Sequence, residues 1–166
     1  MNEEMPPTLL LDTNIWIDYY LGDRPGSKAA AELISVADMR NITLAYPALS
    51  IKDLYYVLNQ ETKREFRKAT GALTEPQAQA CREYAWACVD AMREIAVAAP
   101  IGEPQVWLAC HYKDVHGDLE DDLVLASLET SKADFLVTND EELCRKAPKG
   151  ALSAADMLAY LKVREG

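Results

Sequence analysis

The stretch Leu9-Leu10-Leu11-Asp12-Thr13-Asn14 is an unbroken apolar run that ends on a carboxylate. Near the other end of the chain, Phe135-Leu136-Val137-Thr138-Asn139-Asp140 has the same form. Continuous apolar runs of this length are typical of parallel strands covered on both faces, and ligands of open α/β sheets bind at the carboxyl ends of such strands. The two stretches therefore predict that Asp12 and Asp140 lie at one edge of a sheet.

A third acidic cluster, Asp118-Leu119-Glu120-Asp121-Asp122, precedes an apolar helix. Asp121 shares a helix face with the apolar residues three, four and seven positions later, so we expect it to point toward the sheet. Asp122 falls on another face and is expected to be solvated, whereas Asp118 is placed to cap the helix. Because an inward acid is costly to bury without a partner, the pattern favours Asp121 as a metal ligand and leaves Glu120 open.

Three of the acids at or near these positions also have a purely structural explanation. Asp12 and Asp140 are suitable N-caps for the helices that follow them. Ser50-x-x-Asp53 fits a capping box, which accounts for Asp53 without any site, and spacing alone does not place Asp53 with the others.

Several acids at one sheet edge repel one another unless a cation lies between them. The shared placement of Asp12, Asp121 and Asp140 therefore predicts a divalent metal site.

Strand patterns alternate with helix patterns along the chain. The expected strands lie at about residues 8–11, 42–46, 95–98, 135–137 and 150–152. Amphipathic or capped helical segments separate them, which is the order expected of βαβ units. The fold class expected is α/β, a three-layer sandwich with a central, mostly parallel sheet of four to five strands flanked by helices.

Composition indicates an ordinary globular protein of the cytoplasm. The hydrophobic fraction is 49% and the charged fraction 27%, and no apolar stretch approaches the roughly 20 residues of a membrane span. The first residues are acidic where a secretory signal would be basic. The 4 cysteines form no C-x-x-C pair, so we expect reduced thiols rather than a zinc or disulfide framework.

The charge balance limits how the chain can meet nucleic acid. There are 17 basic and 27 acidic residues, giving a net charge of −10, which argues against a broad basic binding surface. Any contact with nucleic acid must therefore be local. The one concentrated basic stretch, Lys63-Arg64-Glu65-Phe66-Arg67-Lys68, fits a solvated helix face better than a binding patch.

Taken together, four motifs in this order resemble the PIN domain family, which includes the VapC-type toxins of toxin–antitoxin pairs. The motifs are Leu-Leu-Leu-Asp12-Thr-Asn14, Ser50-x-x-Asp53-Leu-Tyr-Tyr, Asp118-Leu-Glu120-Asp121 and Val-Thr138-Asn139-Asp140. The resemblance implies an Mg²⁺- or Mn²⁺-dependent ribonuclease whose acidic quartet is Asp12, Asp53, Asp121 and Asp140. Most family members carry Glu at the second position. Asp is shorter by one methylene, so Asp53 implies either weakened metal binding or a subfamily geometry.

The resemblance extends to organisation, mechanism and partners. It implies one PIN-like domain over residues 1–166, with a helical variable region at about 60–94. In such a site a metal-activated water hydrolyses the RNA phosphodiester, and no protein nucleophile is required. Supporting groups that could orient metal ligands, water or phosphate are Thr13, Asn14, Thr138 and Asn139. The partners implied are RNA as substrate, an antitoxin protein and a second copy of the chain, with no membrane.

Two other classes of function compete with this interpretation. A PIN-like module with an altered quartet could bind RNA or a partner protein with little or no cleavage. Receiver and haloacid dehalogenase folds also place Asp at strand ends. Receivers need a paired acid after the first strand and a lysine after the last, and dehalogenases need D-x-D where this chain has Asp12-Thr13-Asn14. Neither of those patterns is present.

Overall fold

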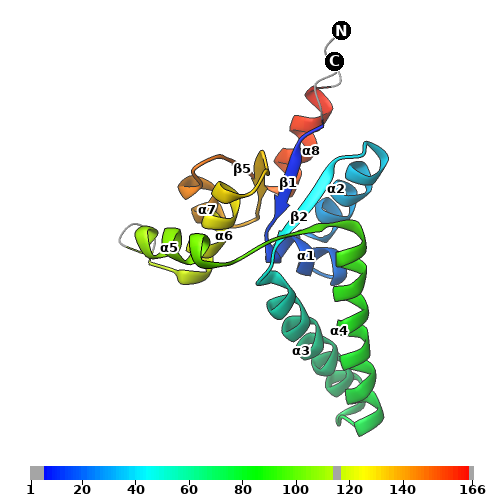
Figure 1. Ribbon diagram of the computed structural model, residues 1–166. Helices are drawn as coiled ribbons and strands as arrows, with labels where there is room; N and C mark the ends of the chain where they lie inside the picture. Colours follow the sequence, from blue (N-terminus) through cyan, green and yellow to red (C-terminus); the bar gives the residue numbers. More distant parts are fainter. Residues whose placement is uncertain (1–5, 114–116, 165–166) are drawn as a thin grey trace.

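The computed structural model describes residues 6–113 and 117–164, and Figure 1 shows their arrangement. Strands and helices alternate along most of this part of the chain. In chain order the elements are β1 (Thr8–Leu11), α1 (Thr13–Tyr20), α2 (Ser27–Met39), β2 (Thr43–Pro47), α3 (Ser50–Thr70), α4 (Glu75–Ile95), β3 (Val97–Ala99), α5 (Glu103–Tyr112), α6 (Leu119–Thr130), β4 (Phe135–Val137), α7 (Glu141–Lys146), β5 (Gly150–Leu152) and α8 (Ala154–Val163).

The described strands form one sheet of five, in the order β3-β2-β1-β4-β5. All four pairings are parallel, and in the centre Leu10 of β1 aligns with Ala45 of β2 on one side and Leu136 of β4 on the other. The chain runs outward from β1 in one direction through β2 and β3, then returns to the other side for β4 and β5. The strand order therefore reverses between β1 and β4, the place where open α/β sheets bind ligands.

Alternate residues of β1 face two separate cores. Leu9 and Leu11 pack with the apolar faces of α1, α2, α3, α4 and α8. Leu10 packs on the opposite face with Val124, Leu125 and other residues of α6 and α7. Helices thus cover both faces of the sheet, as Figure 1 shows for α2 on one side and α6 and α7 on the other. This confirms the predicted three-layer α/β fold, with every strand pair parallel.

Helices α3 and α4 form a long hairpin that projects from the carboxyl edge of the sheet (Figure 1). Each has 21 residues. Gly71, the residue after the end of α3, has a φ of 76° that is easiest for glycine, and a capping box of Thr74 and Gln77 starts α4. The basic stretch 63–68 lies in the outer part of α3, where Lys68 and Glu65 pair across one helical turn at 2.7 Å. The structure therefore favours the solvated helix face.

A membrane-spanning helix needs both length and hydrophobicity. Across residues 6–113 and 117–164, no helix combines the two to the extent that crossing a bilayer requires.

Candidate active site

Asp12 follows β1 directly and caps α1, so its carboxylate lies at the carboxyl edge of the central strand. The residue is only 8% exposed. Its Oδ1 accepts a hydrogen bond from the backbone N–H of Thr13 at 2.7 Å. Its Oδ2 accepts from the Asn14 amide nitrogen at 2.8 Å and from the Thr138 hydroxyl at 2.8 Å. These partners are neutral donors, so they fix the orientation of the carboxylate without neutralising its charge.

Burial raises the pKa of the Asp12 carboxyl from its ordinary 3.8 to about 6. Hydrogen bonds from Thr138 and Thr13 oppose this shift, and the negative charges of Asp121 and Glu120 add to it. Both acids belong to the start of α6. The structure therefore brings the third acidic cluster to the end of β1, and the ionised form of Asp12 is held there at a cost that a nearby cation would reduce.

Asp121 is partly buried and faces acids from two directions. Burial raises its pKa, and the charges of Asp118 and Asp140 raise it further, whereas Lys146 lowers it. Asp121 is also among the acids that raise the pKa of Asp12. The charges that act on Asp121 and on which it acts therefore include acids next to the ends of both β1 and β4.

Asp140 caps α7, as its structural explanation proposed. Its Oδ1 accepts from the backbone N–H groups of Glu142 at 2.8 Å and Leu143 at 3.0 Å. Asp118 caps α6 in the same way. Capping uses one carboxylate oxygen of Asp140 and does not remove its charge from the neighbourhood of Asp121. Cap and site roles are therefore compatible for Asp140.

The prediction that Asp122 is solvated is wrong, because Asp122 is only 1% exposed. Helix α6 buries two faces rather than one: the predicted apolar face lies on the sheet, and the face of Asp122 lies against α5. There, burial together with Glu129 and Asp122 raises the pKa of Tyr112 in α5 to about 12. The helical periodicity identified only the face that contacts the sheet.

The capping-box explanation for Asp53 is also wrong. Helix α3 has Leu49 as its N-cap, with no side-chain hydrogen bond to the first turn. The hydroxyl of Ser50 is instead hydrogen-bonded to that of Thr13, at 2.8 Å, and Ser50 is 1% exposed. The hydroxyl expected to cap α3 thus joins α3 to the start of α1, and Asp53 is left without a capping role.

Asp53 stands beside the acids of α6. Its Oδ1 forms an ion pair with Lys52 Nζ at 3.0 Å, and its side chain is 24% exposed. Burial raises the pKa of Glu120, and the negative charge of Asp53 is the next largest cause. Glu120 is therefore repelled by Asp53 and by Asp121, and it repels Asp12. Asp121 is in turn repelled by Asp140.

In the part of the chain that the structure describes, no three His, Cys, Asp or Glu side chains converge on one point closely enough to hold an ion.

Sequence reasoning missed Asp18, which is 5% exposed inside α1. Its Oδ1 lies 2.5 Å from Arg24 Nε, and its Oδ2 accepts from the Asn139 side-chain nitrogen at 2.9 Å. The backbone N–H of Asn139 in turn donates to Asn14 Oδ1 at 3.1 Å, and Asn14 donates to Asp12. A usable signal was present, because Asp18 lies one helical turn after Asn14 on α1.

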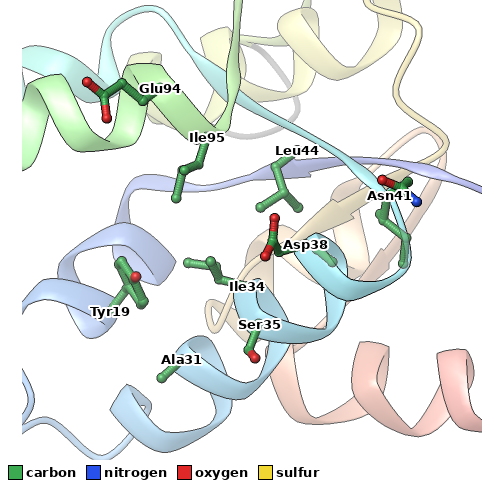
Figure 2. A pocket seen from close by; sticks show the side chains of 11 residues that line it. Tyr19, Ala31, Ile34, Ser35, Asp38, Asn41, Leu44, Glu94 and Ile95 are labelled. Carbon is green, nitrogen blue, oxygen red and sulfur yellow. The ribbon is translucent and has the colours of Figure 1, made fainter.

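One pocket of the described residues lies away from these acids. Figure 2 shows it between α2, β2 and the end of α4, with Ile34, Asp38 and Leu44 among the residues around it. Its volume is about 570 Å³, and none of the predicted site residues lines it. A second hollow of about 580 Å³, at the carboxyl ends of β4 and β5, is lined by Thr138 and Asn139.

Comparisons with known proteins identify the family of the chain. The family model described as PIN domain matches residues 8–142. No curated protein sequence matches the chain. One similar solved structure is VapBC2 from Rickettsia felis bound to a DNA fragment from their promoter, with 13% identity, a TM-score of 0.61, and coverage of 88% of this chain and 97% of that chain. Another is VapBC-1 from nontypeable Haemophilus influenzae, with 15% identity, a TM-score of 0.58, and coverage of 89% and 98%.

At such identities the solved structures show that the fold is shared. The family match includes the ends of β1 and β4 and the start of α6, where Asp12, Asp140 and Asp121 lie. The chain therefore belongs to the PIN domain family.

Proposed function

We propose that the chain is a metal-dependent endoribonuclease that hydrolyses RNA phosphodiesters with metal-activated water. The observation that carries the proposal is the Asp12 carboxylate, which is buried at the end of the central strand and repelled by Asp121 and Glu120. Like charges held close together destabilise the folded state, so a buried carboxylate that is repelled by its neighbours is a candidate for function. Membership of the PIN family supports nuclease chemistry at this position.

The donor chemistry fits Mg²⁺ or Mn²⁺. Both are hard ions that prefer carboxylate oxygen, and Mg²⁺ is usually held by one or two carboxylates with several waters rather than by a full protein cage. Asp12, Asp121 and Asp140 are the residues that would hold the ion, with Asp53 as a further ligand. When bound, the ion would lower the pKa of a water and neutralise charge on the phosphate.

The chain's own residues would prepare this chemistry. Thr13, Asn14 and Thr138 hold the Asp12 carboxylate in one orientation, and Asn139 holds Asn14. At pH 7, a carboxyl with a pKa of about 6 is mostly ionised, which is the form that binds a cation.

We further propose that the chain is the toxin of a toxin–antitoxin pair in the cytoplasm. The solved structures of similar fold are VapBC complexes, which supports an antitoxin partner. A second copy of the chain is a further proposed partner. The net charge of −10 suits a basic partner and requires that RNA contact the chain locally.

A second candidate is a PIN-like module that binds RNA or a partner protein with little or no cleavage. The observation that favours it is Asp53, which is one methylene shorter than the usual Glu and is paired with Lys52 at 3.0 Å. This candidate predicts weak metal binding with retained binding of RNA or of the partner.

A cleavage assay on the full chain separates the two. Single-stranded and structured RNA would be incubated with the protein and Mn²⁺, Mg²⁺ or a chelator, using wild type, Asp12→Asn and Asp121→Asn. Asp90→Asn is a matched control, because Asp90 is an exposed acid on α4. We expect metal-dependent cleavage by wild type and the control, and losses of about 1,000-fold in the two site variants, equivalent to several kcal/mol.

Equal cleavage by all four proteins would indicate a contaminating nuclease and would overturn the enzyme proposal. Binding of RNA without cleavage by any of them would favour the binding module.

A further inference from the structure

The hydrogen-bond network around Asp18 joins three separate segments of the chain. Asp18 belongs to α1, Arg24 to the loop before α2, and Asn139 to the turn between β4 and α7. We propose that Asp18 is a positioning residue that orients Asn139 and Asn14 and thereby the Asp12 carboxylate. The inference rests on the proposed function, in which Asp12 is a metal ligand.

Both oxygens of Asp18 are used as acceptors. Oδ1 receives Arg24 Nε at 2.5 Å and Oδ2 receives Asn139 Nδ2 at 2.9 Å. Arg24 and Asn139 both donate to Asp18. An Asn at position 18 would have one acceptor oxygen and one NH₂ group, so it could accept from one neighbour but would place a donor against the donor of the other. The arrangement therefore specifically requires a carboxylate, and at 5% exposure water cannot readily replace the lost partner.

Asn139 connects Asp18 to the residues around Asp12. With its side chain held by Asp18, its backbone N–H donates to Asn14 Oδ1 at 3.1 Å. That contact fixes which end of the Asn14 amide faces the turn, so Asn14 Nδ2 is directed toward Asp12 Oδ2 at 2.8 Å. Asp12 is thus oriented through two asparagines from segments that are 125 residues apart in the sequence.

Gly26 gives independent evidence that the contact between Asp18 and Asn139 leaves no room for a side chain at position 26. The φ of Gly26 is −82°, which any residue can adopt, so the backbone does not require glycine there. A Cβ at this position, however, would lie 2.0 Å from Asp18 Oδ2 and 2.9 Å from Asn139 Nδ2. A side chain at position 26 would therefore displace the contact between Asp18 and Asn139.

The test uses two variants with matched controls. Gly26→Ala displaces Asp18 without removing it, and Asp18→Asn removes one acceptor. Gly22→Ala is the glycine control, because a Cβ at Gly22 meets nothing within 4 Å, and Asp23→Asn is the acid control, because Asp23 is exposed in the same loop. Thermal unfolding identifies the variants that fold.

Two measurements are made on the folded proteins. The first is the side-chain amide NMR signals of Asn14 and Asn139 without metal, and the second is Mn²⁺ affinity by calorimetric titration. We expect Gly26→Ala and Asp18→Asn to shift both amide signals and to weaken Mn²⁺ binding about 10-fold. Both controls are expected to match wild type.

Unchanged Asn14 signals in a folded Gly26→Ala protein would overturn the inference, as would a change confined to Asn139. If wild type itself fails to bind Mn²⁺, the proposed function fails, but the metal-free NMR signals still decide whether Asp18 orients Asn14. A variant that loses Mn²⁺ affinity while keeping both amide signals would also contradict the inference, because the loss would not pass through the asparagines.

Discussion

The two sides of the acidic edge are built in different ways. Asp12 is 8% exposed and its carboxylate accepts three hydrogen bonds from neutral donors on α1 and the β4 end. Asp53 is 24% exposed at its side chain and is held by one ion pair to Lys52, whose own side chain is 63% exposed. Exposed pairs of this kind contribute little to stability. The hydrogen bonds therefore fix Asp12 on the strand side, whereas Asp53 on the α3 side is free to adjust its side chain.

The largest expected effect is a pH dependence of stability that arises from Asp12. Its folded-state pKa of about 6 lies above the ordinary 3.8, so the folded protein holds this proton more tightly than the unfolded chain. The resulting stabilisation is fully present below pH 3.8 and is lost as the pH rises to about 6. We expect a loss on the order of 3 kcal/mol across this range, which Asp12→Asn should lack.

Urea unfolding of wild type and Asp12→Asn between pH 4 and pH 7 measures this difference, because all other titrating groups are common to both proteins. Mn²⁺ added at pH 7 should restore stability to wild type alone, since a ligand that binds only the folded state stabilises it. Parallel pH profiles for the two proteins would show that the strand side carries no special electrostatic cost.

Local patterns predicted most of the fold. The strands expected at 8–11 and 150–152 match β1 and β5. The position predicted for the third strand is less accurate: the strand was expected at 95–98 and lies at Val97–Ala99. Ile95 instead completes the last turn of α4, because the continuous apolar run from Ile95 to Ala99 does not mark where the helix ends and the strand begins.

The site could be predicted only where one local rule governs it. Strand ends predicted that Asp12 and Asp140 lie at one edge of the sheet, and helical periodicity made Asp121 the candidate from the third cluster. Contacts between distant segments decided the rest, because α5 buries Asp122 and Thr13 binds the Ser50 hydroxyl. Helical spacing places Asp18 one turn after Asn14, but its partner Asn139 lies 121 positions away, so the contact itself has no local signal.

A smaller effect is expected from Asp53, on the adjustable side. Asp53→Asn should weaken Mn²⁺ binding by no more than about 10-fold, because water can replace a peripheral carboxylate. Asp53→Glu should strengthen binding, since the added methylene restores the usual reach. Calorimetric titration against Asp12→Asn and the exposed control Asp90→Asn gives the comparison. A loss in Asp53→Asn as large as that in Asp12→Asn would mean that the two sides are equally fixed.

The smallest effect is expected on the outer part of α3, away from the acidic edge. Lys68 Nζ and Glu65 Oε1 lie 2.7 Å apart, but the two side chains are 60% and 59% exposed. Water screens such a pair, so Glu65→Gln should change the free energy of unfolding by less than about 0.5 kcal/mol. Urea unfolding at low and high salt measures it, and Mn²⁺ affinity should stay at the wild-type value. A clear loss of metal binding in this variant would mean that the hairpin and the acidic edge are coupled, and that exposure alone does not separate fixed from adjustable parts of the molecule.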